Sequence, residues 1–502
     1  MLKILPTGTI KALDAYTIEQ GSIASIDLME RACRAFVSWF VEKFDSTHAI
    51  GIVCGTGNNG GDGLGIARLL HEHGYGVKIW VVKGTVSESI DFRLNLDNAR
   101  AIKLEIVELA DESDERFPFA DRNVLIDGLF GSGLTRPLTG IYARVIEYIN
   151  NANATRVAID IPSGLMADSP SVGAIVKADF TVSFQLPKLA FMFPENYSVV
   201  GDWAVVDIGL NKDFIKKAET EHFYLIPKDP RRILKKRSKF DHKGVYGHAL
   251  IVAGSKGKMG AAILASQAAL RSGPGLLSIH VPKCGYQIIQ TAVPEAMATV
   301  DQHDDYFTDE IDLKNFSAIG IGPGLGNSGE TIKAYGDLLK HWGKPMVIDA
   351  DGLNIMAENK ELLQLVPAGS ILTPHPKEFE RMVGKWQNDF ERMDKQKELA
   401  KRLKSVVVLK GANSAIASPE GKVCFNSTGN PGMATGGAGD VLTGILTGLL
   451  AQGYDCFQAA ILGVYLHGLS GDLAVLEYGM NSLIASDLVN FLPSAFLRLH
   501  RE

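Results

Sequence analysis

Cysteine is scarce in this chain, and its few copies stand far apart. The 502 residues include five cysteines, none of which belongs to a CxxC pair or to a Cys/His spacing that binds zinc: Cys33, Cys54, Cys284, Cys424 and Cys456. An odd number of widely spaced thiols argues against a disulfide scaffold, because such scaffolds need paired cysteines and an oxidising compartment. We therefore expect a cytoplasmic protein with reduced thiols.

Charge of one sign and long apolar runs are also lacking. The formal net charge is only −6, so there is no basic excess to attract a nucleic acid. The N-terminus, MLKILPTGTIKALDAYTIEQ, meets charge and polarity too early for a secretory signal. The most apolar region, residues 441–471, is interrupted by Asp455, Gln458 and His467. It predicts buried helices and not a membrane span.

Glycine-rich turns are the most informative feature that is present. Residues 430–448 read NPGMATGGAGDVLTGILTG, in which a glycine turn at 436–439 runs through Asp440 into an apolar stretch of helical character. A turn that opens a helix presents unpaired N–H groups and the positive end of the helix dipole, which together form an anion site. Asp440 either caps that helix or handles a proton or metal beside a bound phosphate. Further acidic and glycine-rich turns favour the second interpretation.

The first half of the chain predicts an open α/β sheet with acidic strand ends. Helical patterns lie within residues 1–44 and 91–102, and apolar runs of strand type are at 49–54, 76–82, 123–127, 156–160, 180–184 and 203–208. The string GTGNNGGDG separates the first of these strands from a helical run at 64–70, as in a nucleotide-binding βα unit. Ligands of such sheets bind at the carboxyl ends of strands, so Asp62, Asp127 and Asp160 together predict a site and not three helix caps. No function follows for Lys188 and Glu195.

The second half repeats the alternation of strands and helices. Strands are expected at 249–254, 275–281, 316–322, 346–349, 371–373 and 406–410, each followed by a turn rich in Gly, Pro or Asp. The charged stretch 211–239 is typical of a solvated linker or helix face, with a phosphate-facing patch as the alternative. We place the domain change near Phe223, which gives domains of residues 1–222 and 223–502. The predicted fold class is α/β, with two doubly wound domains joined by right-handed crossovers.

The motifs GTGNNGGDG, DGLFGSGL and DIPSG resemble the Rossmann-like epimerase domain of the NAD(P)H-hydrate repair enzymes. That family acts on NADHX and NADPHX, cofactors in which water has added across the nicotinamide C5=C6 bond. The resemblance implies a catalytic role for Asp160 and a potassium ion between Asn59, Asp127 and Ser163. Oxygen ligands of this kind suit a hard cation and not zinc. The implied substrate-binding residues are Asn58, Asn59, Gly60, Gly61, Asp62, Gly131, Ser132, Gly133, Leu134, Thr135, Arg136, Pro137, Tyr142 and Asp160.

The motifs GPGLG, VIDADGLN, TPHPKE, LKGANS and NPGMATGGAGDVLTG resemble the ribokinase-like NAD(P)H-hydrate dehydratase over residues 224–495. The resemblance implies ADP as cosubstrate, magnesium, and Asp440 as the base that deprotonates the C6 hydroxyl. The implied nucleotide-binding residues are Lys410, Gly411, Ala412, Asn413, Ser414, Asn430, Gly436, Gly437, Ala438 and Gly439. The implied substrate-binding residues are Ala261, Gly324, His375, Pro376, Lys377, Glu378 and Asp440. His375 could equally be a structural histidine, and Asp349 either faces the phosphate or metal region or caps a strand end.

Together the two halves resemble a bifunctional enzyme that interconverts R and S NAD(P)HX and dehydrates the S form, converting ADP to AMP and phosphate. The family also implies a homo-oligomer. The alternative is a small-molecule alcohol kinase of the ribokinase-like superfamily with an N-terminal nucleotide-binding module, because such kinases share the GxGD turn. A purely binding N-terminal module would have no chemical need for Asp62, Asp127 and Asp160. The residues leave open ADP against ATP and NADHX against NADPHX.

Overall fold

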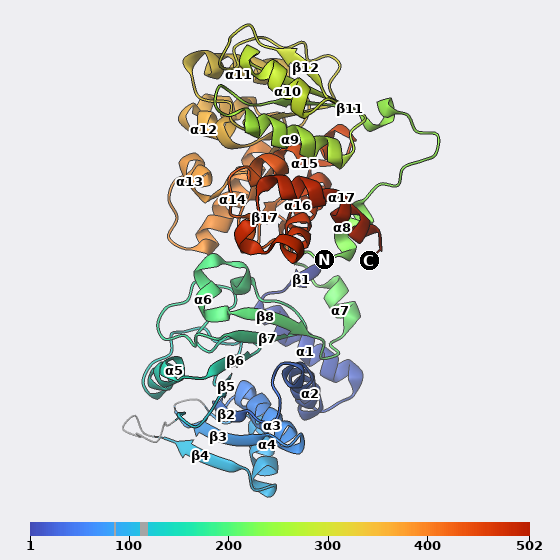
Figure 1. The fold of residues 1–502 in the computed structure, drawn as a ribbon. Helices are drawn as coiled ribbons and strands as arrows, with labels where there is room; N and C mark the ends of the chain where they lie inside the picture. The colour runs from blue at the N-terminus through green and yellow to red at the C-terminus, as the bar shows by residue number, and fades with distance from the viewer. Residues whose placement is uncertain (85–86, 111–118, 502) are drawn as a thin grey trace. The chain divides into compact units, whose positions relative to one another are not determined.

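The computed structural model describes residues 1–84, 87–110 and 119–501. The chain divides into two compact units, which meet in the sequence between residues 220 and 221; the only exceptions are Met1, which belongs to the second unit, and residues 388–390, which belong to the first (Figure 1). Both units are α/β, as the sequence predicts.

In the first unit, seven strands form a sheet in the order β4-β3-β2-β5-β6-β7-β8, and every neighbouring pair is parallel. The strand order reverses between β2 and β5, which is the switch point where ligands of open α/β sheets bind. The strands are β2 (Ala49–Cys54), β3 (Gly76–Val82), β4 (Glu105–Leu109), β5 (Val124–Gly128), β6 (Thr155–Ile159), β7 (Phe180–Phe184) and β8 (Asp202–Val206).

Helices cover both faces of this sheet (Figure 1). Phe36 and Phe40 of α2 and Leu64 of α3 belong to the core on one face, and Val145 and Ile149 of α5 belong to the core on the other. Successive residues of β2 alternate between the two cores, as strand geometry requires. The elements outside the sheet are β1 (Leu2–Ile4), α1 (Thr7–Gly21), α2 (Ser25–Lys43), α3 (Asn58–Glu72), α4 (Ile90–Ala101), α5 (Ile141–Asn151), η1 (Leu189–Met192), η2 (Pro194–Asn196), α6 (Tyr197–Val200) and α7 (Lys212–Lys217).

One boundary differs from the prediction, because α3 begins at Asn58 and not at Leu64. The glycines of GTGNNGGDG therefore lie inside the first turns of the helix. A Cβ on Gly60 would stand 1.8 Å from the carbonyl oxygen of Gly55. Their lack of side chains lets the helix start directly against the end of β2, which outweighs the low helix propensity of glycine.

The second unit has a sheet in the order β9-β18-β17-β16-β15-β14-β13-β10-β11-β12. Its pairs are parallel from β16 to β12, as the predicted doubly wound sheet requires, whereas β16, β17 and β18 pair antiparallel, which the sequence did not predict. The strands β9, β12, β17 and β18 have only three or four residues, too few for a periodic signal. The strands are β9 (His222–Tyr224), β10 (His248–Val252), β11 (Leu276–Val281), β12 (Met297–Val300), β13 (Ala318–Ile321), β14 (Met346–Ile348), β15 (Ile371–Leu372), β16 (Val406–Leu409), β17 (Ala415–Ala417) and β18 (Val423–Phe425).

The largest core of this unit lies between the sheet and the helices α9, α15, α16 and α17. Helix α16 alone, among the described residues, is long and apolar enough to cross a membrane, and 67% of its apolar window is buried inside the unit, as in a core helix. The helical elements are α8 (Lys228–Ile233), η3 (Lys243–Tyr246), α9 (Met259–Ser272), η4 (Lys283–Gly285), α10 (Tyr286–Ala292), α11 (Gly329–His341), α12 (Ala350–Glu358), η5 (Lys360–Leu365), α13 (Pro376–Val383), α14 (Asp389–Leu403), η6 (Pro431–Met433), α15 (Ala438–Ala451), α16 (Cys456–Tyr478), η7 (Met480–Ser482) and α17 (Ala485–Arg501).

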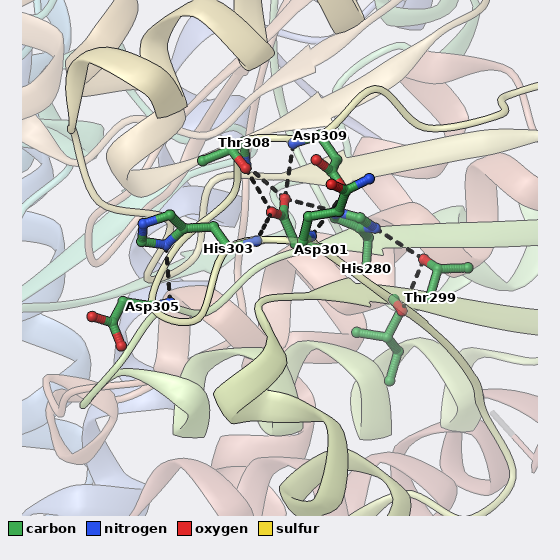
Figure 2. A network of polar contacts seen from close by, with 9 residues as sticks. His280, Thr299, Asp301, His303, Asp305, Thr308 and Asp309 are labelled. Carbon is green, nitrogen blue, oxygen red and sulfur yellow. Dashed lines mark hydrogen bonds and ion pairs between the residues drawn. The ribbon is translucent and has the colours of Figure 1, made fainter.

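A buried carboxylate organises the loop after β12 (Figure 2). Asp301 accepts hydrogen bonds from the backbone N–H groups of His303, Thr308 and Asp309 at 2.6–2.9 Å, and its Oδ2 lies 3.3 Å from Nε2 of His280. Burial alone would raise the pKa of Asp301, but hydrogen bonds from His280 and Thr308 outweigh it and lower that pKa below its ordinary value. The ionised carboxylate thus closes the loop over the end of the sheet.

We predict that Asp301→Asn destabilises the second unit by about 2–3 kcal/mol, because buried N–H donors lose a charged acceptor. Since the folded pKa is depressed, the contribution of Asp301 is present above the unfolded pKa and is lost as the pH falls towards the folded pKa. The measurements are thermal unfolding at neutral and acid pH and hydrogen exchange across residues 301–309. Asp304→Asn is the matched control, because its partner Lys283 is on the surface, and it should change neither.

Candidate active sites

In the first unit, a cavity of about 1110 Å³ lies at the carboxyl ends of β2, β5 and β6. The structure gathers around it all the predicted substrate-binding residues except Gly60 and Gly61, which are buried in α3. The structure therefore brings Asn58, Asn59, Asp62, Tyr142, Asp160 and residues 131–137 to one cavity, and their contact with a substrate stays a prediction. Lys11, Asp14, Thr56 and Phe184 also line the cavity. Sequence reasoning missed Lys11, Asp14 and Phe184 because they come from separate elements, and it gave Thr56 no role although it lies within GTGNNGGDG.

The predicted cation ligands lie near the carboxyl ends of β5 and β6. Asp127 is 1% exposed and accepts hydrogen bonds from N and Oγ of Ser163 at 2.7 and 2.6 Å. Burial raises the pKa of Asp127 to about 6 despite these hydrogen bonds, which lower it. Asn59 lies close to the end of β5, since a Cβ on Gly128 would stand 3.2 Å from its carbonyl oxygen. Its buried side-chain Nδ2, an N–H donor, has no hydrogen-bond partner among the described residues, so it favours an acceptor atom of a bound substrate and does not itself ligate a cation.

A carboxylate, an amide and a hydroxyl are donors that fit a hard monovalent cation. Among the described residues there is no group of three His, Cys, Asp or Glu side chains placed to hold a metal ion. The set is therefore unlike a zinc or iron site.

Asp160 is held in an unusual backbone conformation by a buried lysine. Its φ is +65°, a left-handed value that costs energy for a residue with a side chain. Its Oδ1 accepts hydrogen bonds from Phe184 N at 3.0 Å and from Lys188 Nζ. Lys188 is 2% exposed. A lysine inside the apolar string LPKLAFM could have signalled this pair, because a buried ammonium group requires an anionic partner.

Two further carboxyl groups share this cavity. Burial, followed by the negative charges of Asp160 and Asp14, raises the pKa of Asp62 well above its ordinary value. Burial and then the charge of Asp160 raise the pKa of Asp14 to about 6. The cavity therefore brings together three carboxyl groups, of which Asp14 and Asp62 have raised pKa values, and closely spaced carboxyl groups of this kind suit acid–base chemistry.

In the second unit, the glycine turn opens α15 as predicted. Gly437, with φ +94°, is the N-cap residue, and Asp440 lies in the first turn without a capping hydrogen bond from its side chain. The interpretation of Asp440 as a helix cap is therefore wrong. Burial and then the charge of Asp349 raise the pKa of Asp440 to about 6, while Lys410 lowers it. A carboxylate kept near the amides of 436–439 with such a pKa is suited to accept a proton.

Asp349, at the end of β14, connects three elements around this turn. Its Oδ1 accepts a hydrogen bond from Lys410 Nζ at 2.8 Å, and its Oδ2 accepts one from Thr443 Oγ1 at 2.9 Å. Its side chain caps no helix, although it stands at the N-cap position of α12. A Cβ on Gly439 would stand 3.3 Å from Lys410 Nζ, so the glycine leaves room for this ion pair beside the turn.

His375 has a structural task. It is the N-cap residue of α13, where its Nδ1 accepts hydrogen bonds from the N–H groups of Lys377 and Glu378 at 3.1 and 3.4 Å. Glu378 Oε2 in turn accepts a hydrogen bond from His375 N at 2.8 Å. The ring is still 44% exposed, so its contact with a substrate stays a prediction.

Two residues that sequence reasoning missed support the nucleotide-binding stretch. Asp472 of α16 accepts hydrogen bonds from Gly429 N and Asn430 Nδ2, both at 2.9 Å. His467 of the same helix lies 2.9 Å from the carbonyl oxygen of Ala438. Burial lowers the pKa of His467 to about 4, so it is neutral and donates its Nε2–H to that carbonyl. Both residues lie in the apolar helix, where only a tertiary contact reveals their role.

The fold and these sites define a two-domain α/β enzyme whose second domain is ribokinase-like. A solved ribokinase-like superfamily protein from Enterococcus faecalis superposes with a TM-score of 0.50 at 24% identity, covering 57% of this chain and 99% of its own, which supports the fold alone. A family model described as NAD(P)H-hydrate dehydratase matches residues 249–494, and one described as YjeF-related protein N-terminus matches residues 25–190.

Whole-chain relatives identify the family. The bifunctional NAD(P)H-hydrate repair enzyme of Thermofilum pendens is 37% identical over 100% of this chain and 97% of its own length. The enzyme of the same name from Moorella thermoacetica is 38% identical over 98% of this chain and 96% of its own. The chain belongs to the family of bifunctional NAD(P)H-hydrate repair enzymes.

We predict that Asp349→Asn lowers the stability of the second unit by about 2–3 kcal/mol, because Lys410 and Thr443 lose a buried anionic partner. Thermal unfolding and hydrogen exchange at the start of α15 measure the effect. Asp337→Asn removes a surface ion pair with Lys340 and should change neither quantity. A wild-type unfolding profile for Asp349→Asn would mean that the pair does not hold the turn in place.

Proposed function

We propose that this chain repairs hydrated nicotinamide cofactors with two active sites. Residues 1–222 interconvert the R and S forms of NADHX and NADPHX at C6, and residues 223–502 dehydrate the S form, converting ADP to AMP and phosphate. The observation that carries the proposal is Asp440, a half-buried carboxylate that caps no helix yet lies in the first turn behind the glycine amides of an anion site.

The dehydration follows from this placement. A hydroxyl is a poor leaving group, so Asp440 takes its proton while the hydroxyl oxygen attacks the terminal phosphoryl group of ADP. The backbone N–H groups of residues 436–439 stabilise the charge on the transferring group. Loss of phosphate from C6 and of a proton from C5 then restores the C5=C6 double bond. Residues 410–414 and Asn430 hold the nucleotide, while Ala261, Gly324 and His375 to Glu378 hold the substrate.

Magnesium, when bound, neutralises phosphate charge during this transfer. Both oxygens of Asp349 accept a hydrogen bond, from Lys410 and Thr443. The nucleotide phosphates would supply oxygen ligands to the ion, as is usual for magnesium.

The epimerisation requires proton exchange at a hemiaminal carbon, for which Asp160 is the base. Potassium, held by Asn59, Asp127 and Ser163, would supply positive charge and order the loops that carry these residues. The Nδ2 group of Asn59, unpartnered among the described residues, supports an acceptor atom of the substrate beside this position. The free thiols support a cytoplasmic location, and the homo-oligomer rests on the family resemblance.

The competing function is an alcohol kinase of the ribokinase-like superfamily. It would use the same base and the same glycine turn but would leave the phosphate on its product. The acid-lined cavity in the same chain favours repair, because an epimerase makes the R form available to an S-specific dehydratase.

The decisive experiment follows NADH absorbance at 340 nm with mixed R and S NADHX, magnesium, potassium and either ADP or ATP. We expect full recovery of NADH, faster with ADP. Recovery that stops near half would mean that only the dehydratase works, and replacing potassium with sodium should slow the second half selectively. No recovery with either nucleotide would move the assignment to a kinase.

We predict that Asp440→Asn slows dehydration by about 100-fold to 10,000-fold, because the general base is lost. Interconversion of R and S NADHX should be unchanged, which provides an internal control for folding of the chain. Because the pKa of Asp440 is raised to about 6, the wild-type dehydration rate should fall as the pH drops through 6, where the base becomes protonated. An undiminished rate in Asp440→Asn would exclude it as the base.

A further inference from the structure

Lys188 is the most deeply buried lysine of the first unit, and its contacts converge on one carboxylate. Its Nζ donates hydrogen bonds to Asp160 Oδ1, to Ser183 Oγ at 2.8 Å and to the carbonyl oxygen of Leu186 at 3.4 Å. Its side chain is 2% exposed and that of Asp160 is 13% exposed. Water is thus largely excluded from the ion pair, so the ammonium group acts on Asp160 with little screening.

The two carboxylate oxygens of Asp160 differ in their hydrogen bonds. Within the described residues, Lys188 Nζ and Phe184 N both donate to Oδ1, whereas Oδ2 accepts no hydrogen bond. Asp160 also lines the cavity. One oxygen is therefore held by the protein, and the other is left for a ligand in the cavity.

The other charged groups of the cavity are arranged unequally around this pair. Asp14, Asp62 and Lys11 line the same cavity as Asp160. The charge of Asp160 raises the pKa of both Asp14 and Asp62, and buried Asp91 adds to the effect on Asp62. Lys188 opposes the shift at Asp14, and only weakly compared with burial. Among the described residues, Lys188 forms an ion pair with Asp160 and with no other carboxyl group of the cavity.

We propose that Lys188 is a positioning residue for epimerisation, which holds Asp160 by its Oδ1 and leaves Oδ2 free to accept a proton, while Asp62 supplies the second proton. This inference rests on the proposed epimerase activity. It assigns separate tasks to two carboxyl groups that share one cavity, because among the described residues Asp160 is paired with a buried lysine and Asp62 is not.

The step balances without any further reactant. Asp160 takes the proton of the C6 hydroxyl, the C6=O bond forms, and the N1–C6 bond breaks. The electron pair of the N1–C6 bond moves to N1, and N1 takes the proton of Asp62. Rotation about C5–C6 presents the other face of the aldehyde, and the reverse transfers close the ring and return both carboxyl groups to their starting states.

The test measures interconversion of purified R and S NADHX by chromatography, with the full chain and no nucleotide, so that the dehydratase is idle. Lys188→Met should lower kcat by about 100-fold with little change in KM, since the base and not the binding surface is altered. The acid limb of its kcat–pH profile should move to higher pH, whereas Lys188→Arg should keep the wild-type limb. The double variant with Asp160→Asn should be no slower than Asp160→Asn alone, because both changes affect one group.

Lys78→Met is the matched control, because it removes another lysine ion pair of this unit, with Glu105 at 2.6 Å, and should leave kcat unchanged. If Lys188→Met does not fold, Lys188→Gln fills similar volume and can still donate to Ser183; the same loss and pH shift are then expected. A rate within threefold of wild type, an unmoved acid limb, or independent effects in the double variant would overturn the inference alone. Failure of the wild-type protein to interconvert the two forms would overturn the proposed function and this inference with it.

Discussion

Burial of carboxylates at the ends of parallel strands is the constraint on which both units depend. A parallel sheet gathers the carboxyl ends of its strands at one edge, and helices cover its faces, so an aspartate placed there loses water. Such a charge is costly unless hydrogen bonds or a cation compensate it. Some of these aspartates accept several hydrogen bonds and others accept few. That difference separates structural carboxyl groups from reactive ones.

Asp301, Asp127 and Asp349 are surrounded by donors. Asp301 accepts several backbone N–H groups, Asp127 accepts two hydrogen bonds from Ser163, and Asp349 has a lysine and a threonine. Asp62 and Asp440 have no comparable donors, and burial raises the pKa of each. The neighbouring charge that helps to raise the pKa is that of Asp349 for Asp440 and that of Asp160, which pairs with Lys188, for Asp62.

The sequence predicted both α/β sheets and half of the residues that line the cavity, 12 of 24, because strand ends and glycine turns are local patterns. It placed the start of α3 late, since Gly60 lies in the helix only because the backbone of Gly55 approaches it. It also left Lys188, Asp472 and His467 without a role. Each acts through a partner from another element. The distance along the sequence between the two partners follows no helix or strand periodicity, so the sequence pattern does not reveal it. The antiparallel strands β17 and β18 were missed because three residues are too few for a periodic signal.

The contact between α15 and α9 has a consequence for motion. A Cβ on Gly444 would stand 2.0 Å from the carbonyl oxygen of Ala265, so the two helices touch backbone to backbone near the middle of α15. Helices packed this closely cannot slide or turn past one another without a clash. Helix α15, which carries Asp440, is therefore fixed relative to α9. Any closing of this site around a nucleotide must come from the loops at the strand ends.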